Sequence, residues 1–218
     1  MDLLDAVVIG AGHNGLTCAA YLGMAGHSVR VLERRGVVGG AAITEEFHPG
    51  FRNSVAAYTV SLLQPKVIAD LELHRHGLKI VERRAQNFLP TEDGRYLLTG
   101  EGRTQKEIAK FSAQDADRFP VYAEEIARAA AVLRGLVLEA PPNVTFGARS
   151  LGELGKLLKL GTSLLRHGAR ARRTLQHLLE QSAGDFLDSR FSSDPIKAVL
   201  GFDSIVGNFA SPYASGSA

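Results

Sequence analysis

The pattern of apolar and polar residues is clearest in the first 33 positions, where it predicts a strand, a turn, a helix and a second strand. Residues 6–9 (AVVI) form a continuous apolar run rich in β-branched side chains, which is typical of a strand buried in a parallel sheet. A turn is expected over 10–14, followed by a helix over 15–25 that Gly26 ends. The second strand is predicted at 28–33 (SVRVLE). This order defines a βαβ unit.

The pattern is less regular from residue 36 onward. Glycine and turn-forming residues dominate 36–54, which predicts an ordered loop with short pieces of structure. Residues 61–77 are predicted to form a helix or a broken helix, with Pro65 near the first turn of its second part. The stretch 78–102 is predicted to form strands joined by a hairpin turn at 92–94 (EDG).

From Thr104 onward the periodicity is helical. Ser112 is a predicted N-cap for a helix that ends at 140–143 (APPN). A second helical tract is expected over 150–182 and a third over 185–200. The carboxyl-terminal half is therefore predicted to be mostly helical.

Too few strands are predicted for a complete nucleotide-binding sheet. Only two strands of the parallel type precede the helices, whereas a doubly wound sheet of this kind has about five or six. A sheet of two strands has open edges and little core. We therefore expect an α/β chain that is incomplete, in which 1–82 is the amino-terminal part of a cofactor-binding domain and 83–218 is a partial substrate domain. The composition of the tail, 211–218 (SPYASGSA), favours truncation of a longer polypeptide.

Three glycines form a GxGxxG motif between the first strand and the helix, at Gly10, Gly12 and Gly15. The first glycine permits a tight turn, the second lets the backbone approach a pyrophosphate, and the third lets helix and strand pack closely. The free amides at the start of the helix would face the phosphates. Because strand, helix and second strand fall in register around the motif, the pattern indicates a dinucleotide site.

Two further features extend this site. Glu33 lies 18 residues beyond Gly15, at the end of the second predicted strand, where a carboxylate can accept hydrogen bonds from both ribose hydroxyls. Its charge should repel a 2′-phosphate, which disfavours NADP. Gly39 and Gly40 can bring the backbone against the far side of a dinucleotide, although a plain flexible turn explains the same pair. The residues themselves leave NAD and FAD open as the ligand.

The stretch 5–51, which holds these glycines and Glu33, resembles the amino terminus of the phytoene-desaturase-like flavoproteins. Within that family it is most similar to a branch of pyridine nucleotide-disulfide oxidoreductase domain-containing proteins. The likeness continues through 61–78 and more weakly through 115–126. It implies an FAD-dependent oxidoreductase of the dehydrogenase or desaturase type, in which flavin accepts a hydride from a hydrophobic or small organic substrate. Members of the family are longer, and their carboxyl-terminal part returns to complete the FAD domain.

The resemblance also implies where the cofactor lies. It predicts a Rossmann-like, glutathione-reductase-like FAD-binding unit with FAD at the glycine-rich turn and Glu33 on the adenosine ribose. The Gly39–Gly40 pair would lie near the diphosphate and ribityl chain. The predicted cofactor-binding residues are Gly10, Ala11, Gly12, His13, Asn14, Gly15, Glu33, Arg34, Gly39, Gly40, Ala41 and Ala42.

No catalytic residue is predicted. Thr44, Tyr58 and Asp203 could approach a flavin, but nothing local selects one as an acid or base. His74 and His76 are expected at the surface, and no spacing suits a metal site. Two other interpretations stay open: an NAD-dependent dehydrogenase with the same βαβ unit, and a non-catalytic fragment of a flavoprotein.

The amino-acid composition excludes only a few classes of function and partner. The 25 basic and 23 acidic residues give a net charge of +2, which provides no reason to expect nucleic acid as a partner. The single cysteine, Cys18, excludes an internal disulfide and dithiol redox chemistry, and it fits a reducing, cytoplasmic compartment. No apolar run reaches the length of a membrane span, and the first strand begins too early for a signal or transit peptide.

One basic tract stands out. Residues 156–177 contain six Lys or Arg and no acidic residue. On a helix, an apolar stripe flanked by these cations suits a membrane surface, and a solvated helix of the substrate domain explains the same residues. Peripheral membrane contact and homo-oligomerisation are both kept as expectations. The predicted stripe consists of Leu157, Leu160, Leu164 and Leu165.

Overall fold

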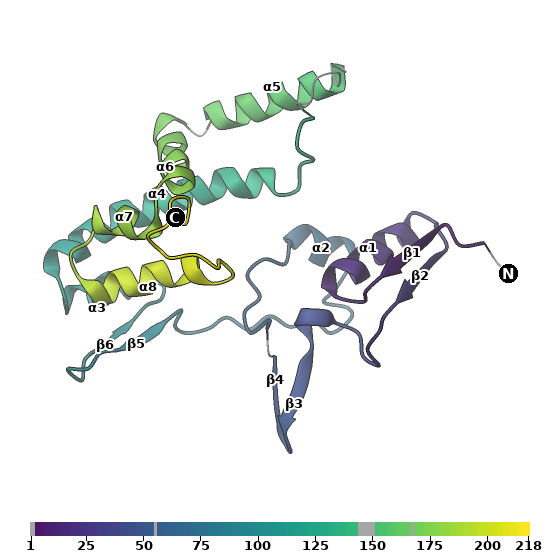
Figure 1. The fold of residues 1–218 in the computed structure, drawn as a ribbon, viewed down its shortest axis with the longest axis horizontal. Coiled ribbons are helices and arrows are strands. Elements are labelled where there is room, and N and C mark those ends of the chain that lie inside the picture. The colour runs from purple at the N-terminus through teal and green to yellow at the C-terminus, as the bar shows by residue number, and fades with distance from the viewer. Residues whose placement is uncertain (1–2, 55, 144–150, 167) are drawn as a thin grey trace. The chain divides into compact units, whose positions relative to one another are not determined.

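The computed structural model describes residues 3–54, 56–143, 151–166 and 168–218 (Figure 1). The chain divides into two compact units, Met1–Glu82 and Arg83–Ala218. The fold is mixed α/β, with short strands in both units and most of the helices in the second (Figure 1).

The first unit opens with a Rossmann-like βαβ unit made of β1 (Ala6–Ile9), α1 (His13–Met24) and β2 (Val29–Leu32). The two strands pair in parallel, from Ala6 opposite Val29 to Ile9 opposite Leu32. The predicted fold class is thereby confirmed. The sequence placed the helix start too late, because His13 and Asn14 already belong to α1 and the preceding turn is shorter than predicted. Gly12, in an extended conformation, is the N-cap, and its carbonyl accepts the first helical bond from the Leu16 amide at 2.9 Å.

The rest of the first unit contains a hairpin that the sequence did not predict. A 3-10 turn, η1 (Gly40–Ala42), leads into β3 (Thr44–His48) and β4 (Phe51–Ser54), which pair antiparallel. The sequence predicted an ordered loop with short pieces of structure over 36–54, and η1, β3 and β4 are such pieces. The pairing of β3 with β4 was not predicted, because these strands are mostly exposed and lack the apolar alternation of a half-buried strand. Helix α2 (Pro65–Asp70) carries Pro65 in its first turn, and turns rather than helix continue to Gly77.

The second unit begins with the predicted hairpin, formed by β5 (Phe88–Pro90) and β6 (Tyr96–Leu98) in antiparallel pairing. Ser112 is the N-cap of the longest helix, as predicted, and its hydroxyl oxygen accepts a hydrogen bond from the Asp115 amide at 3.1 Å. The helices of this unit are α3 (Thr104–Ala109), α4 (Ala113–Leu136), α5 (Leu151–Arg166), α6 (Gly168–Glu180), α7 (Ala183–Asp188) and α8 (Asp194–Ile205).

Several predicted helical tracts are shorter or divided. Helix α4 ends at Leu136, before the predicted 140–143, and each of the two later tracts consists of two helices. A start signal explains the division between α7 and α8, because a proline lies in the first turn of α8. Ser182 caps α7 by accepting from the Asp185 amide. The tail, whose composition is of low complexity, is ordered by backbone bonds such as Gly216 N–H to Gln181 O at 2.9 Å.

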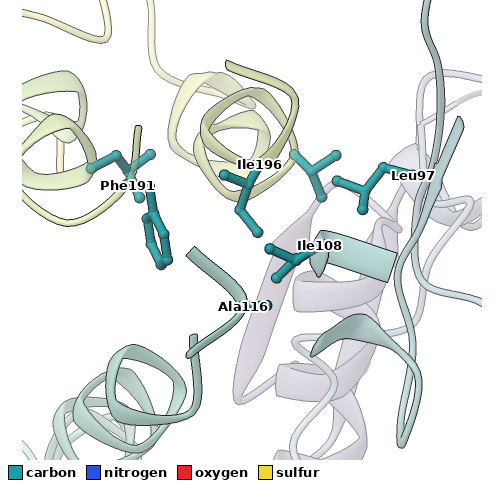
Figure 2. Packing of buried hydrophobic residues seen from close by; sticks show 7 residues of the cluster. Leu97, Ile108, Ala116, Phe191 and Ile196 are labelled. Atoms are coloured by element: carbon teal, nitrogen blue, oxygen red, sulfur yellow. The ribbon is translucent and has the colours of Figure 1, made fainter. Parts of the chain in front are cut away.

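The core of the second unit joins the hairpin to the helices. Leu97 from β6, Ile108 from α3 and Ile196 from α8 point toward one another (Figure 2), and none is more than 1% exposed. Residues from α4, α7, α8 and the segment between α7 and α8 complete the cluster, so the core gathers parts of the chain that are distant in sequence. Its other buried members are Ala116, Leu187, Phe191 and Val199.

A buried carboxylate ties the start of α4 to the start of α8. Asp115 is 0% exposed, and its side chain accepts hydrogen bonds from the Ser193 amide at 2.8 Å and the Ser192 amide at 3.1 Å. The Ser192 hydroxyl also donates to it, at 3.2 Å. A buried carboxylate with several donors fixes the segments that supply those donors.

Replacing Asp115 should therefore destabilise the second unit. We expect Asp115→Ala to lower its free energy of unfolding by about 3 kcal/mol, since hydrogen bonds to a buried charged group are lost and the Ser192 and Ser193 amides are left without their acceptor. Asp117→Ala, at an exposed position of the same helix, is the matched control. Urea denaturation followed by circular dichroism measures both, and equal stability of the two variants would contradict this role.

Candidate dinucleotide-binding site

The glycine-rich turn lies against two other segments of the first unit. The Gly10 amide donates to the Leu32 carbonyl at the end of β2, at 2.7 Å. The Gly39 amide donates to the Ala11 carbonyl, also at 2.7 Å, and Gly12 pairs with Gly39 in a parallel bridge. The structure thus brings the GxGxxG turn, the end of β2 and the Gly39–Gly40 pair together.

Two of these glycines allow backbone segments to approach one another closely. A Cβ on Gly15 would lie 2.1 Å from the Gly10 carbonyl oxygen and 3.4 Å from Val8 Cγ1, so a side chain there would force α1 away from β1. A Cβ on Gly40 would lie 2.8 Å from the Gly12 Cα. The fold itself therefore requires glycine at both positions.

Gly12 differs from them. A Cβ on Gly12 would meet only the Gly40 Cα, at 3.8 Å, which is an ordinary van der Waals contact. Its φ of −75° is accessible to any residue. The packing of the described residues therefore gives no reason for glycine here. A ligand that contacts the backbone at this turn would explain why glycine stands at this position.

The amino terminus of α1 has free donors. No side chain caps the helix, and its first turn has no acidic residue. Among the described residues, no hydrogen bond uses the amides of Asn14 or Gly15. These donors and the helix dipole favour an anion at this end of the helix.

Glu33 follows β2 directly and turns its carboxylate toward the glycine-rich turn. One oxygen accepts from the Ala11 amide at 2.8 Å and the other from the Arg35 amide at 2.9 Å. These bonds, that of Arg35 first, lower the pKa of Glu33 below its ordinary value. Each carboxylate oxygen can accept more than one hydrogen bond, so the group can still bind a ligand hydroxyl.

The other predicted residues lie around this turn with less definite roles. His13 and Asn14 occupy the exposed first turn of α1, and Arg34 is exposed beside Glu33. Ala41 and Ala42 lie in η1, directly after the glycine pair. Sequence reasoning missed Arg35, whose guanidinium forms an ion pair with Glu45 of β3 and joins the end of β2 to the hairpin. No motif singles this arginine out.

The structure selects no catalytic residue. Thr44 begins β3 opposite Ser54, Tyr58 is exposed, and Asp203 belongs to α8 of the second unit. His74 lies in a turn after α2, with its Nδ1 2.9 Å from the Leu78 carbonyl oxygen. In the part of the chain that the structure describes, no group of three or more His, Cys, Asp or Glu side chains could hold a metal ion. Within the same residues, no helix is long and apolar enough to cross a membrane.

A comparison with protein families identifies the class of domain that contains this site. Residues 8–71, which include the second half of β1, all of α1 and β2, Glu33 and the Gly39–Gly40 pair, match the family model of the NAD(P)-binding Rossmann-like domain.

Similar proteins carry the comparison further. The chain is 44% identical to the pyridine nucleotide-disulfide oxidoreductase domain-containing protein 2 of Mus musculus, over 98% of this chain and 39% of that protein. The Rattus norvegicus protein of the same name is 42% identical over the same shares. The predicted resemblance to this branch is confirmed. The chain thus spans about two fifths of the length of these relatives.

Two other likenesses are more limited. One of the limonene dehydrogenase subunits of Castellaniella defragrans is 43% identical over 53% of this chain and 21% of that protein. The structure of wild-type putrescine oxidase bound to putrescine superposes with a TM-score of 0.53 at 20% identity, covering 98% of this chain and 40% of that one. This second likeness concerns the fold.

Proposed function

We propose that the chain is part of an FAD-dependent oxidoreductase and that its first unit holds the ADP half of the cofactor. The observation that carries the proposal is the turn at Gly12, where the backbone is open to a ligand between the free amides of α1 and the Glu33 carboxylate. The names of the similar proteins are those of an oxidoreductase, a dehydrogenase and an oxidase, which supports redox chemistry.

Each part of the turn has a role in this proposal. The amides of Asn14 and Gly15 would donate to the diphosphate, and the Glu33 carboxylate would accept from the adenosine ribose. Gly39 and Gly40 would let the backbone lie close to the diphosphate and ribityl chain. Bound flavin supplies hydride acceptance from an organic substrate. The protein supplies position and electrostatics, and no described residue is assigned as acid or base.

A second candidate is a nicotinamide dinucleotide, favoured by the family description matched over 8–71. The same amides and the same carboxylate suit the adenosine half of NAD. The negative charge of Glu33 opposes a 2′-phosphate, so NADP is the least suited of the three dinucleotides. Resemblance to flavoproteins and the Gly39–Gly40 pair favour FAD over NAD.

Equilibrium binding to the purified chain tests the proposal. FAD should bind, ADP should displace it, and FMN should not compete, because FMN lacks the adenosine half that the turn recognises. Binding of NAD with no binding of FAD would replace the proposal by the second candidate. Binding of neither dinucleotide nor ADP would contradict a nucleotide site at this turn.

The Glu33 carboxylate gives the site a specific pH dependence. Its pKa is lowered by the Arg35 and Ala11 amides, so the group stays ionised until the pH falls below its ordinary value of 4.5. Ionised Glu33 also stabilises the folded unit above that pH, and the contribution is lost as the pH falls through the lowered pKa. We expect FAD affinity to be constant between about pH 5 and 8, because the FAD diphosphate, unlike the terminal phosphate of ADP, does not titrate in that range.

Neutralising the same group should weaken binding. Glu33→Gln is expected to lower ADP affinity about tenfold, because the charged acceptor is lost and the new NH2 group cannot accept the bond from whichever of the Ala11 and Arg35 amides it faces. Glu82→Gln, at an exposed position of the first unit, is the matched control. Isothermal titration calorimetry measures both, and wild-type affinity in Glu33→Gln would remove Glu33 from the site.

A further inference from the structure

Helix α5 presents apolar side chains to solvent. Leu154, Leu158 and Leu165 are 55%, 61% and 62% exposed. At about 100° per residue these three positions lie within about 40° of one another around the helix axis. They therefore form one exposed apolar face, hereafter the leucine face. Leu157 and Leu165 of the predicted stripe are exposed, and the side chains of Leu160 and Leu164 lie outside the described residues.

The polar side of α5 contacts the segment that follows α4. Lys159 forms an ion pair with Glu139, just beyond α4, at 2.7 Å. Glu153 pairs with Lys156 at 2.7 Å and accepts from the Asn143 amide at 2.6 Å. The contacts of Lys159 with Glu139 and of Glu153 with the Asn143 amide thus join α5 to the segment after α4, while its leucines remain uncovered by described residues.

Three arginines with no ion-pair partner among the described residues follow directly. Helix α6 begins two residues after α5 ends and leads away from it (Figure 1). Arg170, Arg172 and Arg173 in its first half are exposed, and none has an ion-pair partner among the described residues. Ala171 and Thr174 of the same helix are buried, so α6 packs on its unit through its small residues. These three charges, unlike those of Lys156 and Lys159, are available to an anionic partner.

We propose that the leucine face of α5 and the arginines of α6 dock this chain on an anionic lipid surface. The leucines would enter the boundary between headgroups and acyl chains, and the guanidinium groups would bind lipid phosphates. An apolar face alone would suit many partners, and it is the adjacent unpaired positive charge that favours anionic lipid. The contact is peripheral, since no described helix can span a membrane. The inference does not depend on nucleotide binding.

Co-sedimentation of the 218-residue chain with vesicles tests the proposal. The chain should bind phosphatidylcholine vesicles that contain phosphatidylglycerol much more strongly than pure phosphatidylcholine, and added salt should weaken binding. Replacing the three arginines by glutamine (R170Q/R172Q/R173Q) should lower the partition coefficient about a hundredfold. A control removes the same charge at exposed sites elsewhere in the unit, R83Q/R103Q/K106Q, and should retain most of the binding.

A second variant tests the apolar contribution. Leu154→Ser with Leu158→Ser changes only exposed side chains, so it should fold normally by circular dichroism and lose most of the vesicle binding. Equal binding to both kinds of vesicle, or no effect of the arginine replacements, would overturn the proposal. So would light scattering that shows a dimer converted to a monomer by the serine variant, because the leucine face would then belong to a second copy of the chain.

Discussion

Gly12→Ala should fold like the wild type and lose FAD and ADP affinity by about ten- to a hundredfold. The added methyl group meets only an ordinary contact at 3.8 Å within the protein, so the fold tolerates it. In the complex the same methyl group would occupy space next to the diphosphate, and overpacking of this kind costs about 1–3 kcal/mol. Isothermal titration calorimetry gives the affinity, and far-UV circular dichroism with a thermal melt checks the fold.

The chain offers a matched control for this variant. Gly23 lies inside α1, and a Cβ there would have nothing within 4 Å. Gly23→Ala adds the same methyl group to the same helix, should bind as the wild type does, and should raise stability by up to about 1 kcal/mol through helix propensity. Equal affinities of Gly12→Ala and Gly23→Ala would show that no ligand approaches the backbone at Gly12.

Gly15→Ala should instead destabilise the first unit itself. The Cβ would lie 2.1 Å from the Gly10 carbonyl oxygen, which belongs to the backbone and cannot turn aside as a flexible side chain can. The backbone of α1 or of the turn at Gly10 must therefore move to remove this clash. We expect a loss of about 3 kcal/mol or more in the free energy of unfolding. Hydrogen exchange of the amides of β1 and α1 measures this loss locally.

Comparison of the two alanine variants separates folding from binding. Gly15→Ala would lose nucleotide affinity together with protection of β1 and α1 from exchange, whereas Gly12→Ala would lose affinity alone. If Gly15→Ala keeps wild-type protection from exchange, the result would contradict the close contact of Gly15 with the Gly10 carbonyl oxygen.

The sequence predicted the βαβ unit well because the information for it is local. A β-branched run, three glycines and a helix of small residues lie within 33 residues. The bounds of β1, α1 and β2 agree closely with these features. The β3–β4 hairpin escaped prediction because its strands are polar and exposed on most sides. The divisions of the later helices depend on caps and tertiary contacts that periodicity does not carry. Asp115, for example, bonds to Ser192, which is 77 positions away.

For the candidate site, too, the sequence predicted what depends on local spacing and missed what depends on the path of the chain. The roles of Gly10, Gly15 and Glu33 follow from motif spacing, and the structure brings these residues to one turn. The contact of Gly40 with Gly12 and the ion pair of Arg35 with Glu45 come from the path of the chain after β2, which glycine-rich composition does not specify. Spacing indicates which residues can serve the site, and the chain path decides which of them touch.

Two-dimensional amide NMR of the chain, titrated with ADP, shows whether the glycine-rich turn and Glu33 hold the adenosine half of a dinucleotide. If they do, the shifts should be concentrated in the amides of 10–16, 33–35 and 39–42, and they should be absent in Gly12→Ala at the same ADP concentration. Saturable shifts confined to other residues, or shifts that persist unchanged in Gly12→Ala, would contradict binding at this turn.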